Sequence, residues 1–272
     1  KSKAFRNVIN SQIRSGIKTE LKAKNFLLLE INLPDLETQI LIKNKINLAS
    51  NKISELSDIE GKNESYISKL RQQILQEAVQ GKLVKQDSKE LPNKKLGDLA
   101  QFINGRAFKS SEWGIKGFPI IRIQNLTNSN NYFHYYNGEF EDKNLIKRGD
   151  ILLAWSATLD IFRWKQEEAL LNQHIFKVIP NEKIISKKYF VYLIKAILEK
   201  IKQKTHGIGM FHITKPKLVS IEVNLPHLPE QICIVEKVDK LMAYCDELEK
   251  RVKENQVNSK KLMEAVLKES FK

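Results

Sequence analysis

One stretch of this chain occurs twice, and this repeat constrains the fold more than any other feature. Residues 29–48 read LEINLPDLETQILIKNKINL, and residues 221–240 read IEVNLPHLPEQICIVEKVDK. The two copies align without a gap at an offset of 192, with nine identical residues and a shared NLP-x-L lead-in. Each copy opens a long segment of the same pattern, so the chain is assembled from two related pieces.

Downstream of both copies, mainly apolar residues recur at alternating steps of three and four, which is the period of a coiled coil. In a helix these residues form one stripe along its surface. Each segment predicts a helix of roughly 40 residues, or about 60 Å. Neither helix can bury its stripe alone, so we expect the two to pack together. The residues expected to pair the helices are Ile46, Ile53, Leu56, Asn63, Ile67, Leu70 and Ile74 in the first copy, and Val238, Leu241, Cys245, Leu248, Val252, Asn255, Leu262 and Val266 in the second.

Two features interrupt the stripe near the middle of the helices. The polar pairs Glu60–Asn63 and Asn255–Ser259 stand at stripe positions, where polar side chains reduce stability but fix the register of the pair. A locally solvated, loosened turn explains the same residues equally well. Gly61 is the weakest helical position, because glycine costs about 1 kcal/mol against alanine within a helix.

Between the two helices, residues 91–220 lose the heptad pattern. The runs GFPIIRIQNL, GDILLAWSA and NQHIFKVIP are short, apolar or alternating, and bounded by Gly, Asn and Pro, which is typical of strands. Residues 187–204, KKYFVYLIKAILEKIKQK, predict an amphipathic helix. The predicted fold class is therefore α+β, with one mixed α/β domain and two long helices.

The segment before the first copy follows the same order in miniature. A short predicted helix over residues 3–14 precedes Gly16 and the strand-like FLLLEINLP, so we interpret this segment as the tail of a second copy of the middle domain. The expected divisions are 1–33 for the tail, 34–82 for the first long helix, 83–228 for the complete domain and 229–272 for the second long helix.

The basic side chains are concentrated in two blocks. The net charge of the chain is +14; residues 1–24 carry +6 and residues 91–220 carry +10, whereas the segments 25–90 and 221–272 each carry −1. A blocky basic excess indicates a polyanion as partner, most often nucleic acid. A general richness in lysine across the source proteome is the competing explanation.

Several functional classes find no support in the sequence. No apolar run of about eighteen residues exists, so no membrane span is expected. Cys233 and Cys245 lie twelve apart in one predicted helix and cannot bond to each other, which fits a reducing cytoplasm. The histidines are scattered, so no group of residues with metal-ligand spacing is expected. No Gly-rich phosphate-binding loop precedes a helix, so nucleotide hydrolysis is not expected either. The chain is therefore predicted to be no enzyme and to hold no cofactor.

Four blocks of sequence resemble, in their order and spacing, the specificity subunit of type I restriction-modification systems. They are LGDLAQFINGRAF with GFPIIRIQNLTN, then LIKRGDILLAWSATL, then NQHIFKVIP, and finally GMFHITKPKLVSIEVNLPHLPEQICIVEKVDKL. No block is specific alone, but the four blocks together with the repeat are. The resemblance covers nearly the whole chain, except that most of a first recognition domain is missing.

This resemblance implies a target recognition domain that reads one half of a split double-stranded DNA site. It also implies that the two long helices pair antiparallel, set the distance between half-sites and dock two modification subunits. Those subunits bind S-adenosylmethionine and methylate adenine, and motor–nuclease restriction subunits join in the full complex. We expect either a truncated chain or a natural half-length subunit; in the second case two copies could assemble on a symmetric split site.

Polar residues in loops at strand ends are the predicted DNA readers, because Arg pairs with guanine and Asn or Gln with adenine, while phosphate contacts position the protein. The residues expected to contact DNA are Arg106, Lys109, Ser110, Ser111, Arg122, Gln124, Asn125, Thr127, Trp155, Ser156, Thr158, Arg163, Gln173, His174, Met210, His212 and Lys215. Arg122 could instead lie on the solvated face of a strand, and Trp155 could be a core residue. The lysines could be ordinary surface residues.

A protein-binding scaffold is the main alternative function. In this interpretation the helices form a coiled coil and the middle domain binds another protein without reading DNA. A recognition domain of a fused restriction–methylation enzyme and a stand-alone enzyme are weaker alternatives. Near-neutral helices beside a basic domain favour DNA.

Overall fold

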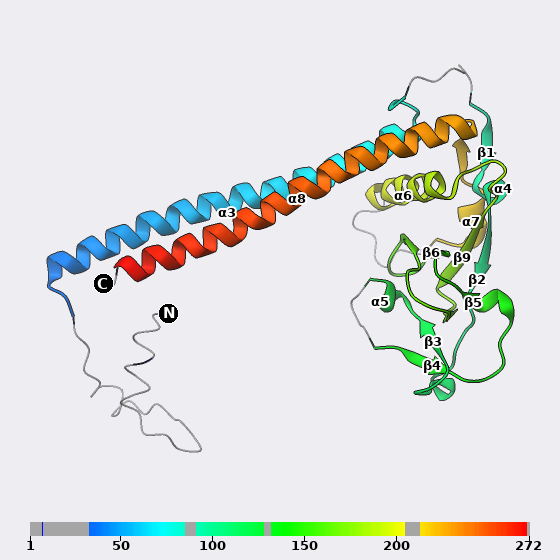
Figure 1. The fold of residues 1–272 in the computed structure, drawn as a ribbon, viewed down its shortest axis with the longest axis horizontal. Coiled ribbons are helices and arrows are strands. Elements are labelled where there is room, and N and C mark those ends of the chain that lie inside the picture. Colours follow the sequence, from blue (N-terminus) through cyan, green and yellow to red (C-terminus); the bar gives the residue numbers. More distant parts are fainter. Residues whose placement is uncertain (1–6, 8–32, 85–90, 128–131, 205–212, 271–272) are drawn as a thin grey trace. The chain divides into compact units, whose positions relative to one another are not determined.

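The protein is described from a computed structural model that covers Asn7 and residues 33–84, 91–127, 132–204 and 213–270. The chain divides into two compact units: a helical unit, Lys1–Gly61 with Glu254–Lys272, and a domain unit, Lys62–Lys253. Helix α3 (Leu36–Val79) and helix α8 (Leu228–Ser270) contribute residues to both units (Figure 1). With 44 and 43 residues, these helices have the length that the heptad pattern predicts.

Within its described residues, the domain unit contains two four-stranded sheets and a two-stranded ribbon. The first sheet has the order β2-β9-β6-β7, the second β4-β3-β8-β5, and the ribbon pairs β1 with β10. The strands are β1 (Asn93–Lys95), β2 (Ala100–Asn104), β3 (Phe118–Ile121), β4 (His134–Tyr136), β5 (Leu145–Ile146), β6 (Ile151–Ala154), β7 (Asp160–Arg163), β8 (Ala169–Leu171), β9 (Ile175–Pro180) and β10 (Glu222–Asn224). The first sheet is antiparallel, and the second is mixed through its parallel β3–β8 pair. These sheets together with the helices confirm the predicted α+β class.

Helix α6 (Lys187–Lys204) occupies the residues that the amphipathic pattern predicts. Its Tyr189, Phe190 and Leu193 are buried in one core cluster with residues of the first sheet. The ring centroids of Phe190 and Phe102 of β2 lie 6.5 Å apart. The main core therefore lies between α6 and the first sheet, and it excludes water from nearly every side chain on that face.

The shorter helical elements connect the strands. They are α4 (Leu96–Leu99), α5 (Ile123–Leu126) and α7 (Lys215–Val219), with the 3-10 turns η1 (Ser110–Glu112) and η2 (Asp142–Asn144). The ribbon brings the two ends of the domain together, because Asn93 faces Asn224 and the Leu225 N–H donates to the Pro92 carbonyl at 3.0 Å.

One predicted strand ends earlier than expected. The run IIRIQNL reads as a strand, but β3 ends at Ile121 and α5 begins at Ile123. The Arg122 backbone N–H donates to Asn125 Oδ1 at 3.0 Å, and the Asn125 side chain donates to the Tyr132 carbonyl at 2.9 Å. A side chain that bonds the backbone locally competes with the sheet ladder, so the chain turns into a short helix here. Arg122 is thus a helix cap and not a strand residue.

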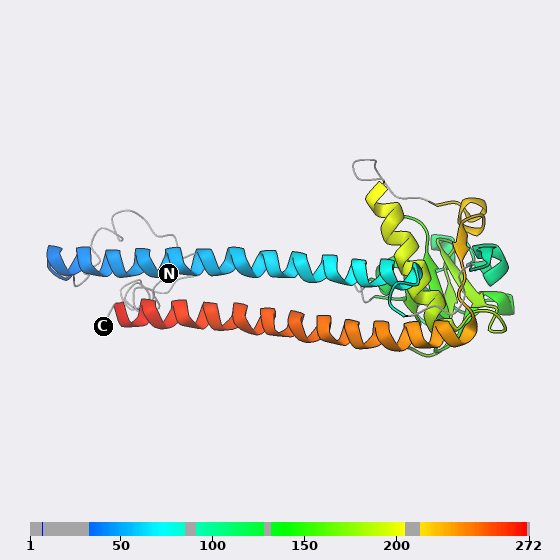
Figure 2. The same cartoon turned by 90° about the horizontal axis from the view of Figure 1, so that it is seen from above.

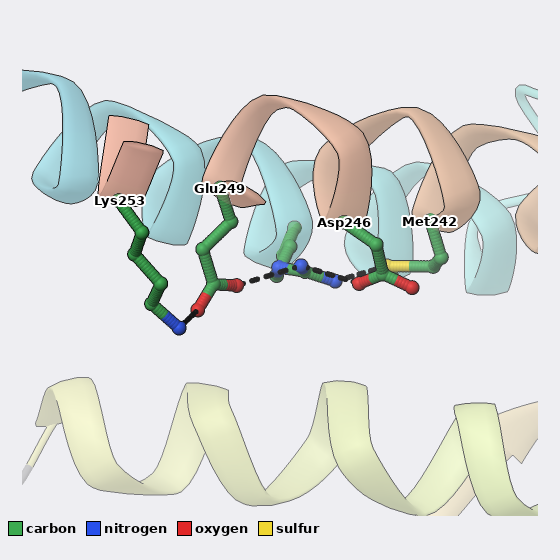
Figure 3. Close-up of polar contacts among 5 residues, drawn as sticks. Met242, Asp246, Glu249 and Lys253 are labelled. Carbon is green, nitrogen blue, oxygen red and sulfur yellow. Dashed lines mark hydrogen bonds and ion pairs between the residues drawn. The ribbon is translucent and has the colours of Figure 1, made fainter. Parts of the chain in front are cut away.

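In the domain unit, α3 and α8 are joined by a charged cluster (Figure 3). Arg71 of α3 donates from Nη2 to Asp246 at 2.6 Å and to Glu249 at 3.1 Å. Glu249 also accepts from Lys253 at 2.7 Å. These pairs help to hold the helices in one register, although each is partly exposed and contributes only modestly to stability.

In the helical unit, the α3 and α8 segments lie side by side in both views (Figures 1 and 2). The Ser259 hydroxyl donates to Glu60 Oε1 at 3.0 Å, and Glu60 is only 9% exposed. Asn63 and Asn255 are exposed. The four polar stripe residues therefore separate into one part-buried pair, Glu60 with Ser259, and two solvated side chains.

The predicted pairing residues form two rows that the structure treats differently. The row Ile46, Ile53, Ile67, Ile74 with Val238, Cys245, Val252 and Val266 is buried or half-buried. In the other row Leu241 is half-buried, but Leu56, Leu70, Leu248 and Leu262 are exposed, as are Asn63 and Asn255. On α8 the half-buried positions Met242, Glu249, Gln256 and Met263 lie one residue later. The contact between the helices thus includes Arg71 and Glu249, which are half-buried, and leaves the neighbouring Leu70 and Leu248 exposed.

Candidate nucleic-acid interface

Four strands of the domain unit have ends that meet at one place. Strands β3 and β8 run parallel, with Ile121 paired to Leu171 at their carboxyl ends. The Asn172 N–H then donates to the Ile121 carbonyl at 3.1 Å. In the first sheet, Ala154 at the end of β6 is paired with Ile175 at the start of β9. The residues that follow β3, β6 and β8 are consequently neighbours.

The end of β2 joins the same place through a close backbone approach. The Arg106 N–H donates to the Leu171 carbonyl at 2.8 Å, and the Gly105 N–H donates to the Ile175 carbonyl at 3.1 Å. A Cβ atom at Gly105 would lie 2.2 Å from the Asn172 carbonyl oxygen. Only glycine fits there, so the GR step after β2 is needed to bring Arg106 beside Asn172.

The turn between β6 and β7 completes the cluster. The Trp155 N–H donates to the His174 carbonyl at 3.3 Å, and the Ile213 N–H donates to the Trp155 carbonyl at 3.2 Å. Ala157 has a φ of 59°, a left-handed conformation that alanine rarely adopts. The Thr158 N–H closes this turn on the Ser156 carbonyl at 2.6 Å.

We call this cluster of loops the strand-end surface. It consists of residues 105–106, 122, 155–158, 172–174 and 213–215. It gathers Arg106, Arg122, Trp155, Ser156, Thr158, Gln173, His174 and Lys215, which the sequence places far apart, into adjoining loops of the two sheets.

Arg106 has structural partners that constrain its side chain. Its Nη2 donates to Glu112 Oε1 at 2.6 Å, and its guanidinium carbon lies 4.7 Å from the Phe108 ring centroid and 4.5 Å from that of Tyr136. Glu112 also accepts from the Lys109 N–H at 2.7 Å, and this bond, with Arg106, holds the pKa of Glu112 below its ordinary value. Arg106 therefore fixes the loop 106–112, a role that the sequence did not indicate.

The same loop presents its remaining polar residues to solvent. Lys109, Ser110 and Ser111 are exposed around the turn η1. Gln173 and His174 are also exposed, and the His174 ring lies 5.5 Å from that of Trp155. Lys215 donates from Nζ to the Phe102 carbonyl at 2.6 Å. Side chains of this kind can approach a ligand without opening the fold.

Four predicted readers are bonded to, or partly covered by, the rest of the domain. Asn125 is 8% exposed and bonds backbone groups through both side-chain atoms, as described above. The Thr127 hydroxyl donates to the Ile123 carbonyl at 3.2 Å. Trp155 packs against the main core, with its ring centroid 5.6 Å from that of Phe176. Gln124 is half-buried.

One predicted reader lies elsewhere in the first sheet. Arg163 ends β7 opposite Ile151, at the far end of the first sheet from Ala154. The structure therefore does not bring Arg163 to the strand-end surface. Met210 and His212 lie outside the described residues.

A ring stack beside Arg122 was not predicted. The Trp113 and His134 rings are stacked with centroids 4.1 Å apart, and the Arg122 guanidinium carbon lies 5.1 Å from the Trp113 centroid. Tyr132 meets His134 edge-on at 5.2 Å. Burial lowers the pKa of His134, and the charge of Arg122 lowers it further. The aromatic run NYFHYY was the only sequence feature that could have indicated this stack.

Two negative observations bear on the possible chemistry. Within the described ranges, no group of three or more His, Cys, Asp or Glu side chains could hold a metal ion. A search of the same residues finds no helix with the length and apolar character of a membrane span. Cys233 and Cys245 are both free thiols, and both lie on α8 as predicted.

Curated relatives are specificity subunits of type I restriction enzymes. The EcoBI specificity subunit of Escherichia coli is 30% identical over 174 residues, which cover 63% of this chain and 36% of that protein. The EcoKI specificity subunit of Escherichia coli strain K12 is 23% identical over 297 residues, covering all of this chain and 63% of the relative. The chain thus spans less than two thirds of the length of these relatives.

Two solved structures share the fold. A chain from a study of complex assembly and conformational transition of the type I R-M system has a TM-score of 0.75 at 18% identity, covering 98% of this chain and 67% of that one. The HsdS subunit from Thermoanaerobacter tengcongensis has a TM-score of 0.59 at 18% identity, covering 98% and 66%. At these identities the likeness concerns the fold.

The family comparison covers the part of the chain that carries the strand-end surface. The family model described as the type I restriction modification DNA specificity domain matches residues 88–259, which is more than half of the chain. All strands from β1 to β10, helix α6 and about three quarters of α8 fall within this match. The chain therefore belongs to the family of type I restriction-modification DNA specificity proteins.

Proposed function

We propose that this chain is a non-catalytic DNA specificity subunit, and that its strand-end surface reads one half of a bipartite site. The observation that carries this proposal is the meeting of the polar loops after β2, β3, β6 and β8 in a domain of this family. Gln173 and His174 of this surface are exposed, as are Lys109, Ser110 and Ser111 of the adjoining loop 106–112, and all five are of the types that contact phosphates and base edges. Arg106 and Asn125 support the reading loops in this proposal and do not contact bases.

The net charge supports DNA as the partner of this domain. The segment 91–220, which includes this surface, carries +10. A positive field raises the association rate with DNA and supplies affinity that is independent of base sequence. Such a chain would act in the cytoplasm, where bacterial and archaeal DNA is accessible.

The two helices supply the second part of the proposal. We propose that residues 34–82 and 229–272 pair antiparallel, set the gap between two half-sites and dock two modification subunits, which would bind S-adenosylmethionine. Docking is supported by four exposed leucines on the two helices, Leu56, Leu70, Leu248 and Leu262. If the helices packed only against each other, fewer apolar side chains would be expected in water. Motor–nuclease restriction subunits would join the same complex.

The division of the chain follows the repeat. Residues 83–228 form the complete recognition domain in this proposal, and residues 1–33 correspond to the tail of another one. The other half-site would be read by a second recognition domain of this kind, which a second copy of the chain could supply.

Mapping of methylated adenines tests the proposal. The chain is co-expressed with its modification subunits in cells whose DNA is otherwise unmethylated at adenine, and the methylated sites are sequenced. We expect a split recognition sequence with a fixed gap. We expect a double variant, in which both Gln173 and His174 are substituted, to change only one half of that sequence. Methylation that is identical without the chain would refute the proposal. A scaffold without DNA readout would give methylation that no substitution in the strand-end surface alters.

A further inference from the structure

Helix α6 contacts the sheet with one face and the two long helices with the other. Its buried face belongs to the main core, as described above. On the opposite side, Gln76 of α3 donates from Nε2 to the Ala196 carbonyl at 2.7 Å, and Gln72 donates to Glu199 at 2.9 Å. Both contacts are polar, and both lie within the domain unit. Helix α6 thus adds polar contacts with α3 to the apolar residues of both long helices that share the main core.

Gln231, in the first turn of α8, makes the most buried of these attachments. It is fully buried, with 0% of its surface exposed. Its Oε1 accepts from the Ser186 N–H at 2.8 Å, and its Nε2 donates to the carbonyls of Ile184 at 2.9 Å and Pro226 at 2.8 Å. One amide therefore bonds the start of its own helix and two backbone groups just before α6. Removing it would leave buried backbone groups without partners.

Asp239, two turns later on α8, makes the second attachment. It accepts from the Lys188 ammonium and the Tyr192 hydroxyl of α6, each at 2.5 Å. Burial acts to raise the pKa of Asp239, but these two donors outweigh burial and leave the pKa below its ordinary value. Asp239 is therefore ionised. A charged acceptor with two donors restricts the relative position of α6 and α8 more tightly than apolar packing does, because its hydrogen bonds are directional.

The internal repeat supplies a comparison within the same chain. Gln39 is the repeat equivalent of Gln231, and its Nε2 donates to the Pro34 carbonyl at 2.7 Å, as Gln231 does to Pro226. Gln39 is exposed, however, and Asn47 stands in the place of Asp239. The bond to the proline carbonyl thus belongs to the helix start in both copies. The bonds from Gln231 to Ile184 and Ser186, and those of Asp239, belong to the attachment of α6.

We infer that Gln231 and Asp239 are positioning residues that fix the angle between α8 and the recognition domain, and thereby the gap length that the protein accepts. This inference rests on the proposed function. Apolar helix contacts tolerate small rotations and slides, whereas a buried amide with three bonds and an aspartate with two donors have few alternative geometries. A change of a few degrees at α6 would shift the reading surface along the DNA, where each base pair advances about 3.4 Å.

The test compares Gln231→Leu and Asp239→Asn with the matched control Gln39→Leu. Each variant is assembled with the modification subunits, and its binding is measured on a series of DNA duplexes in which the gap is lengthened or shortened by one or two base pairs. A second series keeps the gap and changes single bases of a half-site. Gap preference and base preference are thereby measured separately on the same complex.

We expect the wild type and Gln39→Leu to prefer one gap strongly. We expect Gln231→Leu and Asp239→Asn to lower the ratio of affinities for the correct and incorrect gaps by about tenfold, while base preference within the half-site is unchanged. Unchanged gap ratios in both variants would overturn the inference, and so would parallel loss of gap and base preference. If Gln231→Leu fails to fold, Asp239→Asn decides, because its side chain is partly exposed.

Failure of the proposed function would look different. A wild-type complex that shows no preference for any gap length would contradict the ruler role itself, before any variant is considered. A wild-type preference that survives in both variants would contradict only the positioning role of Gln231 and Asp239.

Discussion

Gly61 gives a quantitative test of the helical structure of α3. It lies in mid-helix, it is exposed, and a Cβ atom added there would meet nothing within 4 Å. Alanine therefore gains helix propensity without a steric cost. Gly61→Ala is expected to raise the free energy of unfolding by about 1 kcal/mol, which is about fivefold in the equilibrium constant.

Gly81 is the matched control in the same segment. It has a φ of 72° just after α3. The Gly81 N–H donates to the Ala78 carbonyl at 3.1 Å and the Lys82 N–H to the Glu77 carbonyl at 2.9 Å, which together form a Schellman cap. Alanine is strained in this conformation, so Gly81→Ala is expected to lower the free energy of unfolding by about 1–2 kcal/mol.

Urea unfolding followed by circular dichroism at helix wavelengths measures both variants under the same conditions. Hydrogen exchange of the amides in residues 55–67 locates the effect of Gly61→Ala, which should slow exchange there. A Gly61→Ala variant that is no more stable than the wild type would show that this residue is not in a regular, solvated helix. Equal and favourable effects at Gly61 and Gly81 would refute the argument from backbone conformation.

Three further predictions concern the candidate interface. Glu112→Ala removes the acceptor that holds Arg106 and the Lys109 N–H, so DNA affinity should fall about threefold to tenfold although a negative charge is lost; tighter binding in a filter assay would contradict the loop-holding role. Lys109→Ala should reduce the slope of log affinity against log salt by about one while base preference is kept, and an unchanged slope would exclude a phosphate contact. Because folding lowers the pKa of His134, the unfolded chain binds the proton more readily, so stability should fall as the pH drops below the ordinary value of 6.5. His134→Gln should lack this loss in denaturation curves at pH 5 and 7.5, and an identical pH dependence in both proteins would show that His134 does not cause it.

The long-range plan of the chain follows from patterns that repeat. The shared NLP-x-L lead-in and the heptads predict α3 and α8, and the amphipathic run predicts α6 over residues 187–204. These elements are long, so the pattern of many residues indicates each of them. The short α5 was missed because one local interaction, the bond from the Arg122 N–H to Asn125, outweighs the strand propensity of two isoleucines.

The candidate interface could be predicted only as a set of loops. The sequence indicates polar residues after Gly105, Leu126 and Ala154, but sheet order decides which of those loops meet. The parallel pairing of β3 with β8 brings Asn172 to Ile121, and the glycine at 105 brings Arg106 to Leu171. No local pattern records these pairings, since they join residues about 50 and 65 positions apart. Arg163 is a different case, because β7 runs back antiparallel to the preceding strand β6 and its last residue therefore lies opposite Ile151, at the far end from Ala154.

The heptad pattern leaves a choice that the partner helix resolves. Steps of three and four fit both Leu70 with Leu248 and the neighbouring Arg71 with Glu249 as the second row of the stripe. The structure pairs Arg71 with Asp246 and Glu249, and it leaves Leu70 and Leu248 about 40% exposed. A two-helix pair covers only a narrow stripe on each helix, so apolar residues on a second row need a further surface to become buried. The exposed apolar side chains in this row of both helices therefore support the proposal that a protein partner covers them. The Arg71 cluster determines which row faces that partner, because it places Arg71 and Glu249, and not Leu70 and Leu248, between the helices.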